Sequence, residues 1–135
     1  MNTDLNSITE RIIGCAYNVS NTLGHGFLER VYQNALTFEL RKSGIEVECQ
    51  KTLKVMYQSI IVGEYTADMI VAQSVLVEIK AMKDLDDAHT GQCLNYLKAT
   101  GLHLCLLINF GRPRVQIRRI ISPFDLCSSM SICGE

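Results

Sequence analysis

The stretch Asp68-Met-Ile-Val-Ala-Gln-Ser-Val-Leu-Val-Glu78-Ile-Lys80 predicts a β-hairpin that carries two carboxylates and a lysine. The two segments 65–71 and 75–80 are rich in β-branched and aliphatic side chains, which favour strands. The short polar break between them is typical of a hairpin turn. We therefore expect two antiparallel strands here, joined by a turn centred on Gln73.

This hairpin would gather its charged side chains into one cluster. Asp68 lies directly opposite Glu78, because each is five residues from Gln73. Side chains alternate between the faces of a strand, so Glu78 and Lys80 share one face. Like charges directly opposite each other destabilise a strand pair. A divalent metal ion would offset the two carboxylates better than Lys80 alone.

A solvated strand face is the other interpretation of these alternating charges. The run 74–82 is apolar on both sides of its charges, as in an interior strand that is covered on both faces. Charges at such positions are costly unless they are paired or bound to a metal. Both interpretations stay open on this pattern alone.

Composition predicts one soluble domain. A chain of 135 residues with 47% hydrophobic and 20% charged residues is typical of a globular protein with a proper core. We expect residues 1–121 to form this domain and the tail 122–135 to pack loosely or fray. No signal peptide and no apolar run of membrane-spanning length is seen, so we expect a cytoplasmic protein without membrane contact. The six cysteines show no C-x-x-C pair or zinc-ligand spacing, which favours free thiols in a reducing compartment.

Charge is unevenly distributed, although the net charge is only −1. The segment 88–124 has no Asp or Glu. Its five Lys and Arg residues give it a charge of +5 and are Lys98, Arg112, Arg114, Arg118 and Arg119. Such a block fits a basic face that follows a phosphate backbone, and it equally fits a solvated rim of cations.

The order of periodic segments predicts an α/β fold. A capping box at Ser7-Ile-Thr-Glu10 predicts a first helix over 7–22, and a second helix runs from about 28 to the stop signal at Ser43-Gly44. Strand character follows over 45–49, 53–56 and 60–62, ahead of the hairpin. An acidic start at 84–87 predicts a third helix to residue 100, followed by strands over 102–109 and 115–121. The result is a central mixed β-sheet flanked by helices, with a crossover helix before its returning strands.

Several motifs, taken in this order, resemble the PD-(D/E)xK nuclease superfamily and its restriction-endonuclease-like core. The stretch Gly26-Phe-Leu-Glu29-Arg-Val-Tyr32 is similar to the G-x-x-E-x-x-Y motif that names a small nuclease family within it. The likeness extends over about residues 8–120. It continues through Tyr65-Thr-Ala-Asp68, Val77-Glu78-Ile-Lys80, Gln92-Cys-Leu-Asn-Tyr96-Leu-Lys-Ala-Thr-Gly101 and Leu106-Leu-Ile-Asn-Phe110-Gly111.

The resemblance implies a catalytic centre on the hairpin. Asp68, Glu78 and the carbonyl of Ile79 would hold Mg²⁺, with Mn²⁺ as a substitute. Lys80 would position or deprotonate the attacking water and counter charge on the phosphate. Glu29 matches a helix glutamate that completes the site in related nucleases. An acid in a first helical turn is also favoured by the helix dipole, so both interpretations of Glu29 stay open.

Further residues are implied as substrate contacts. Gln92 and Tyr96 are four apart and share one helix face, as in exonuclease-like branches, although Tyr96 also fits a half-buried packing residue. Tyr32 fits a residue that orients Glu29, and it also fits a core position. The basic block adds two predicted substrate-binding residues, Arg112 and Arg114.

Three positions depart from the family pattern. Ala67 replaces the superfamily proline, Thr66 stands where a basic residue is frequent, and His25 stands where proline is frequent. None of them removes a metal ligand, so they bear on substrate contacts more than on catalysis.

The leading hypothesis is a Mg²⁺-dependent phosphodiesterase that acts on DNA ahead of RNA. The alternatives are a catalytically silent nuclease fold that binds nucleic acid or protein, and a metal-dependent hydrolase with another substrate. A homodimer would let so small a domain cut both strands of a duplex.

Overall fold

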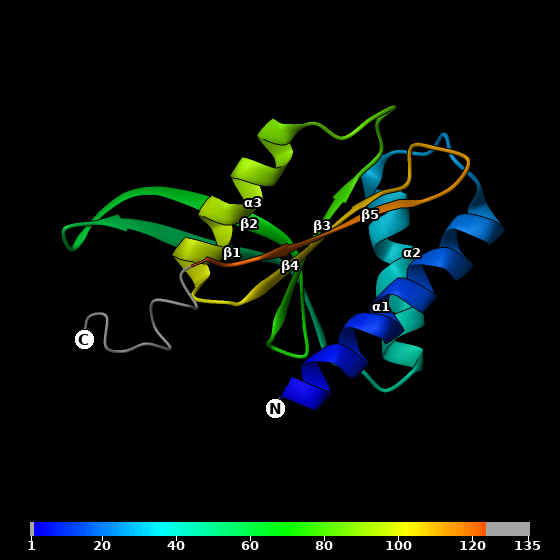
Figure 1. Cartoon of the computed structure of the whole chain (residues 1–135), viewed down its shortest axis with the longest axis horizontal. Coiled ribbons are helices and arrows are strands. Elements are labelled where there is room, and N and C mark those ends of the chain that lie inside the picture. Colours follow the sequence, from blue (N-terminus) through cyan, green and yellow to red (C-terminus); the bar gives the residue numbers. More distant parts are fainter. Residues whose placement is uncertain (1, 124–135) are drawn as a thin grey trace.

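The strands of the chain form one mixed sheet with helices packed against it. The computed structural model describes residues 2–123, with side chains from residue 5. Within these residues the sheet has five strands in the order β1-β2-β3-β4-β5. Neighbouring strands are antiparallel except β3 and β4, which are parallel and joined through α3. The elements are α1 (Asn2–Leu23), α2 (Glu29–Lys42), β1 (Val47–Tyr57), β2 (Ile60–Val71), β3 (Val75–Lys80), α3 (Asp87–Thr100), β4 (Leu104–Asn109) and β5 (Gln116–Ile121). The predicted mixed α/β fold is therefore confirmed (Figure 1).

The two faces of the sheet bury different helices. Val77 and Ile79 belong to a hydrophobic cluster that includes side chains of α1 and α2. Leu76, which directly precedes Val77 and points to the other face, belongs to a second cluster with Cys93 and Leu97 of α3. Figure 1 accordingly shows α1 and α2 together on one side of the sheet and α3 on the other. This alternation confirms that β3 is an interior strand covered on both faces.

The first helix begins earlier than the sequence predicts. The expected capping box at Ser7 is wrong, because α1 already starts at Asn2 and Ser7 lies inside it. Leu5 packs against the hydrophobic cluster of α1 and α2, and this packing stabilises the additional helical turn.

The third helix has the ends that its sequence predicts. Asp86 is the N-cap, and its carboxylate accepts hydrogen bonds from the amides of Ala88 and His89. The His89 side chain completes this capping box by accepting from the Asp86 amide at 3.1 Å. At the other end Gly101 adopts the left-handed conformation, with φ of 77°.

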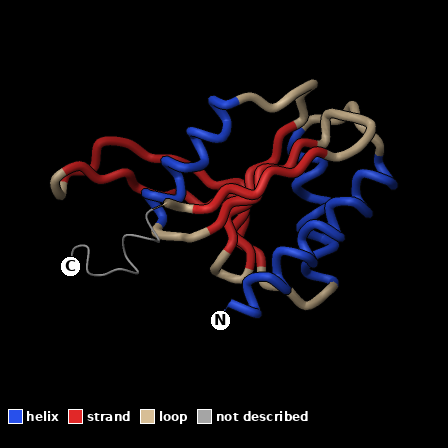
Figure 2. The backbone as a smooth tube through the Cα atoms, in the orientation of Figure 1, coloured by secondary structure: helices blue, strands red, loops and turns tan. Residues whose placement is uncertain are grey.

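The strands β1 and β2 form one long hairpin instead of separate short segments. Their turn, Gln58-Ser59, has positive φ at both residues, as a type I′ hairpin turn requires. The outer part of this hairpin projects from the body of the molecule (Figures 1 and 2). Most of its outer side chains are exposed to solvent.

The second hairpin has the turn that the sequence predicts. Val71 pairs with Val75, and Ala72 and Gln73 between them both have positive φ. The pairing continues to Met69 opposite Val77, which is the register of a turn centred on Gln73.

No helix in the described part of the chain is long and apolar enough to cross a membrane. The four cysteines at positions 15, 49, 93 and 105 are free thiols. From residue 124 onward the predicted tail lies outside the described residues.

Candidate functional site

The strands β2 and β3 part at Asp68 and Glu78, and their carboxylates bind the opposite strand in place of ladder hydrogen bonds. The last paired residues are Met69 and Val77. One step further, Oδ2 of Asp68 accepts a hydrogen bond from the amide of Ile79 at 2.8 Å. Oε2 of Glu78 faces the amide of Asp68 at a longer 3.5 Å. The two carboxylates therefore lie next to each other across the strands, as the predicted register requires.

An irregularity in the sheet turns Asp68 toward this position. Ala67 packs in the α3 cluster and Met69 in the α1–α2 cluster, although side chains two apart on a regular strand share a face. Across from Asp68 in the register, Gln50 has φ of 52°, which leaves it outside the β1–β2 ladder. The register is the same on both sides of Gln50, so this distortion of the ladder is local and inserts no extra residue.

Gln50 is a site residue that the sequence analysis missed. Its amide nitrogen donates to Oε1 of the buried Gln33 at 3.0 Å. A hydrogen bond from the Gln50 side chain also helps to hold down the pKa of Asp68. An ordinary polar residue on a strand carries no local signal of this role, because its partners come from α2 and β2.

Burial makes both carboxylates hard to ionise. Glu78 is only 6% exposed, and this burial together with the charge of Asp68 raises its pKa to about 7. Burial also raises the pKa of Asp68, against the opposing effects of the Ile79 amide and the Lys80 charge. The charge of Glu29 adds a further, smaller increase to the pKa of Asp68. A cation between the carboxylates would relieve this repulsion.

Tyr65 is a second residue that the sequence analysis did not single out. Its hydroxyl donates to Oε2 of Glu78 at 3.0 Å, and burial keeps its pKa far above the ordinary value. Its ring stacks on Tyr96 of α3, with centroids 3.5 Å apart and planes at 14°. Tyr96 is therefore a packing residue that connects α3 with the buried carboxylate through Tyr65.

Replacing Tyr65 by phenylalanine should raise the pKa of Glu78 further, because the lost hydrogen bond stabilises the ionised form. We expect an increase of about half a unit to one unit. The pKa would be read from the carboxyl carbon shift of Glu78 in an NMR titration. Tyr57→Phe, on the exposed hairpin, is the matched control, and an unchanged Glu78 pKa in Tyr65→Phe would contradict this role.

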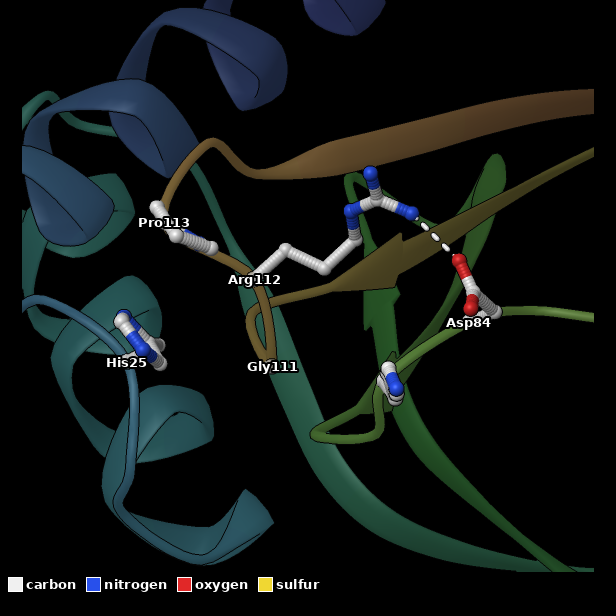
Figure 3. A pocket seen from close by; sticks show the side chains of 6 residues that line it. His25, Asp84, Gly111, Arg112 and Pro113 are labelled. Atoms are coloured by element: carbon white, nitrogen blue, oxygen red, sulfur yellow. Dashed lines mark hydrogen bonds and ion pairs between the residues drawn. The ribbon is translucent and has the colours of Figure 1, made fainter.

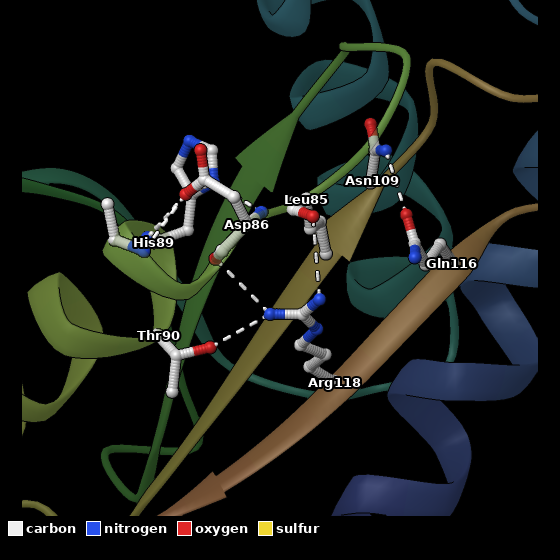
Figure 4. A network of polar contacts seen from close by, with 8 residues as sticks. Leu85, Asp86, His89, Thr90, Asn109, Gln116 and Arg118 are labelled. Carbon is white, nitrogen blue, oxygen red and sulfur yellow. Dashed lines mark hydrogen bonds and ion pairs between the residues drawn. The ribbon is translucent and has the colours of Figure 1, made fainter.

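Asn109 fixes the chain that follows Lys80. The Asn109 side chain is fully buried, accepts from the amides of Met82 and Gly111, and donates to the carbonyl of Met82. It also donates to Oε1 of Gln116 at 3.2 Å, a contact drawn in Figure 4. The amide of residue 110 donates to the carbonyl of Lys80 at 2.8 Å. Lys80 is thus held at the end of β3 by bonds on both sides of it.

Glu29 and Gln92 are exposed at the positions that the sequence predicts. Glu29 is the first residue of α2, where it is an acid of the first helical turn. No group of three or more His, Cys, Asp or Glu side chains comes together as a metal cluster among the described residues. Glu29 therefore does not join the two strand carboxylates as a third direct ligand in this conformation. Gln92 lies on α3 one turn before Tyr96.

Tyr32 occupies a core position, the second of its two interpretations. It is fully buried, and its hydroxyl donates to the carbonyl of Gly24 and accepts from the amide of Phe27. Its ring stacks on Phe110 at 4.6 Å between centroids. The hydroxyl therefore holds the α1–α2 loop, and a contact of Tyr32 with Glu29 or with a substrate stays a prediction.

Two arginines of the basic block make contacts within the protein. Arg118 donates to Thr90 and to the carbonyls of Leu85 and Asp86, so it fastens the start of α3 to β5 (Figure 4). Arg112 is ion-paired with Asp84. The use of the block as a phosphate-binding face stays a prediction.

The loops at the end of β3 and β4 enclose a pocket with a volume of about 340 Å³. Figure 3 shows the Arg112 guanidinium turned toward Asp84, with His25 on the other side of Gly111. Arg114, the other predicted arginine, is exposed in the same β4–β5 loop. The residues that line the pocket are His25, Lys83, Asp84, Gly111, Arg112 and Pro113.

Comparison with known proteins assigns this chain to a class of nucleases. Residues 6–120 match the family model described as the PD-(D/E)XK nuclease superfamily. The chain belongs to this superfamily.

Solved structures with the same fold include two proteins of low sequence identity. An alkaline exonuclease from Laribacter hongkongensis (LHK-Exo) aligns with a TM-score of 0.53 and 14% identity, over 76% of this chain and 60% of that chain. SSO0001 aligns with a TM-score of 0.54 and 18% identity, over 76% of this chain and 54% of that chain. The chain thus spans little more than half of each of these structures, and the likeness concerns the fold alone. No curated protein matches the chain.

Proposed function

We propose that the protein is a Mg²⁺-dependent nuclease that hydrolyses phosphodiester bonds of DNA. The observation that carries the proposal is the meeting of Asp68 with the buried Glu78 at the end of the β2–β3 ladder, beside Lys80. Membership of the nuclease superfamily supports the reaction class. The motif from Gly26 to Tyr32 supports placing the protein in the smaller G-x-x-E-x-x-Y family.

The donor set fits a hard divalent cation. Asp68, Glu78 and the Ile79 carbonyl offer only oxygen atoms, which Mg²⁺ and Mn²⁺ prefer over sulfur or nitrogen. A carboxyl with a pKa of about 7 is costly to ionise in its present surroundings, and a bound cation would lower that cost. Glu29, at the exposed start of α2, adds to the negative charge felt by Asp68 and would bind a water molecule of such an ion.

The chain's own residues would perform distinct tasks in hydrolysis. A bound Mg²⁺ would polarise the scissile phosphate and lower the pKa of an attacking water molecule. Lys80, on the same strand face as Glu78, would orient that water and offset negative charge that develops on the phosphate. Tyr65 holds Oε2 of Glu78 in place through its hydroxyl. The Asn109 contacts with Met82 would hold the chain that follows Lys80 in place.

Exposed polar residues around this centre are the candidates for substrate binding. Gln92 on α3 and Arg114 in the β4–β5 loop are solvent-accessible, and Arg112 would need to leave Asp84 to contact a phosphate. A closed two-fold dimer would present two centres to a duplex. The free thiols fit the reducing cytoplasm that the sequence predicts.

Metal-dependent cleavage is the test of this function. Labelled single-stranded and duplex DNA would be incubated with Mg²⁺, Mn²⁺ or EDTA, and Mg²⁺ binding would be measured by calorimetry. We expect cleavage with either metal, none with EDTA, and a loss of about a thousandfold or more in Asp68→Asn and Lys80→Ala. Mg²⁺ binding should be lost in Asp68→Asn and kept in Lys80→Ala.

Glu48→Gln is the matched control, because Glu48 is a half-exposed acid on β1 that pairs with Lys51. It should cleave DNA like the parent protein. Absence of both cleavage and metal binding in the parent would contradict the proposal and favour a catalytically silent nuclease fold that binds nucleic acid or protein.

A further inference from the structure

A groove separate from the carboxylates lies between the outer part of β1 and the last turns of α3. Its volume is about 500 Å³. One wall consists of Lys54, Val55 and Met56 from β1. The other wall is formed by three residues of α3, namely Asn95, Lys98 and Ala99. None of these side chains has a task in the proposed hydrolysis.

The groove begins where the tyrosine stack of the catalytic centre ends. Leu53, the residue before Lys54, pairs in the β1–β2 register with Tyr65, whose hydroxyl binds Glu78. Tyr96, which stacks on Tyr65, directly follows Asn95 in the opposite wall. Gln50 is the β1 residue opposite Asp68, and Lys54 lies four residues further along β1, or about 13 Å of strand. A nucleic-acid strand of a few nucleotides would bridge the two places.

The chemistry of the groove suits a polyanion with flat apolar faces. Each wall contributes one lysine, and Val55, Met56 and Ala99 supply apolar surface. Beyond the groove, the hairpin tip exposes further large apolar side chains. Met56 is 54% exposed and Tyr57 is 63% exposed, and Ile60, Ile61 and Val62 follow on β2.

These features favour a single strand over a duplex. Proteins that bind single strands combine a positively charged groove with aromatic or apolar surfaces on which unpaired bases lie. A duplex hides the faces of its bases, so the apolar wall and Tyr57 would gain no contact with it. One acid, Glu64, stands opposite Lys54 in the strand register but does not line the groove.

We propose that this groove binds a single-stranded segment of the DNA substrate next to the cleaved bond. Lys54 and Lys98 contact phosphates, and Met56 and Tyr57 contact bases. This inference rests on the proposed nuclease function and specifies the form of its substrate. In this proposal the projecting β1–β2 hairpin binds one DNA strand that runs past Tyr65 and Tyr96 toward Glu78.

Binding can be measured without any cleavage. In EDTA, fluorescence anisotropy would follow a short labelled oligothymidylate over a series of salt concentrations. The double variant Lys54→Ala, Lys98→Ala should bind about tenfold more weakly or worse. Its slope of log affinity against log salt should be shallower by about 1.4, since each phosphate contact on a single strand contributes about 0.7. Tyr57→Ala should weaken binding at an unchanged slope, because it removes stacking and no charge.

Two further proteins make the experiment decisive. Lys51→Ala removes an exposed β1 lysine that pairs with Glu48 outside the groove, and it should bind like the parent. Glu78→Gln should keep the binding to the groove and lose cleavage, so the two proposals can fail separately. If the parent cleaves nothing while the lysine variants still lose affinity, the nuclease proposal fails and the groove stands.

The groove proposal is overturned if the double lysine variant has the affinity and salt slope of the parent. It is also overturned if a duplex of the same length binds as tightly and is equally sensitive to Tyr57→Ala. A dimer that dissociates on Tyr57→Ala, with DNA affinity unchanged, would instead assign the hairpin to a second copy of the chain.

Discussion

Replacing Glu78 by glutamine should abolish the proposed metal-dependent cleavage and should make the metal-free protein more stable at high pH. The folded protein raises the pKa of Glu78 from 4.5 to about 7, mainly because the carboxyl is buried. Between these values the folded state binds more protons than the unfolded state, so stability falls as the pH rises toward 7. Above pH 7 the ionised group costs about 3 kcal/mol of folding free energy. Glutamine has the same shape, accepts from Tyr65 and carries no charge.

Urea unfolding at pH 5 and pH 8 in EDTA measures this effect. Glu78→Gln should be more stable than the parent by about 2 to 3 kcal/mol at pH 8 and by much less at pH 5. Adding Mg²⁺ at pH 8 should stabilise the parent and leave Glu78→Gln unchanged, because only the parent binds the ion. Glu48→Gln, at a half-exposed site, controls for the loss of an acid. Equal stabilities of Glu78→Gln and the parent at pH 8 would show that burial does not strain the carboxylate.

Local patterns predicted the framework that carries this site. The ends of β3 at Val75 and Lys80 agree with the apolar run, and the opposition of Asp68 and Glu78 follows from the turn at Gln73. Side chains on a strand alternate between its two faces, so a shift of the strand pairing by one residue would expose the core side chains. The register is therefore fixed once one face is buried. The ends of α3 were predicted for the same kind of reason, since Asp86 and Gly101 are strong local signals.

The parts that escaped prediction depend on contacts between distant segments. Gln50 is hydrogen-bonded to Asp68 and to Gln33, which is 17 residues away from it, and Tyr65 reaches Glu78 from 13 residues away. The arginine at position 118 was counted with a basic block, but the carbonyls at the start of α3 bind it. Tyr32 was predicted as a substrate contact or a core residue, and the structure shows its hydroxyl holding the preceding loop. Patterns within one segment show which residues are polar or aromatic, and tertiary structure decides what they contact.

Gly111→Ala should be the most damaging substitution outside the carboxylates. A Cβ at this position would lie 2.3 Å from both the amide nitrogen and the carbonyl oxygen of Met82, and 2.7 Å from the carbonyl carbon of Ala81. These are backbone atoms, so no rotation of a side chain can relieve the overlap. Moving them breaks the hydrogen bonds from Asn109 that fix the segment after Lys80. We expect a loss of about 3 kcal/mol in stability or more, combining overpacking with buried unsatisfied groups.

The matched control is Gly91→Ala in α3, where a Cβ would meet nothing within 4 Å. It should stabilise the protein by about 0.5 to 1 kcal/mol, because alanine favours helix more than glycine does. Urea unfolding would measure both variants, and cleavage at saturating Mg²⁺ would be assayed in whatever fraction of Gly111→Ala remains folded. The folded fraction should have a strongly reduced kcat, because displacement of Met82 moves Lys80, two residues before it. A stable Gly111→Ala protein with the parent's kcat would mean that the β3–α3 segment shifts freely, and Lys80 would then owe its position to the strand alone.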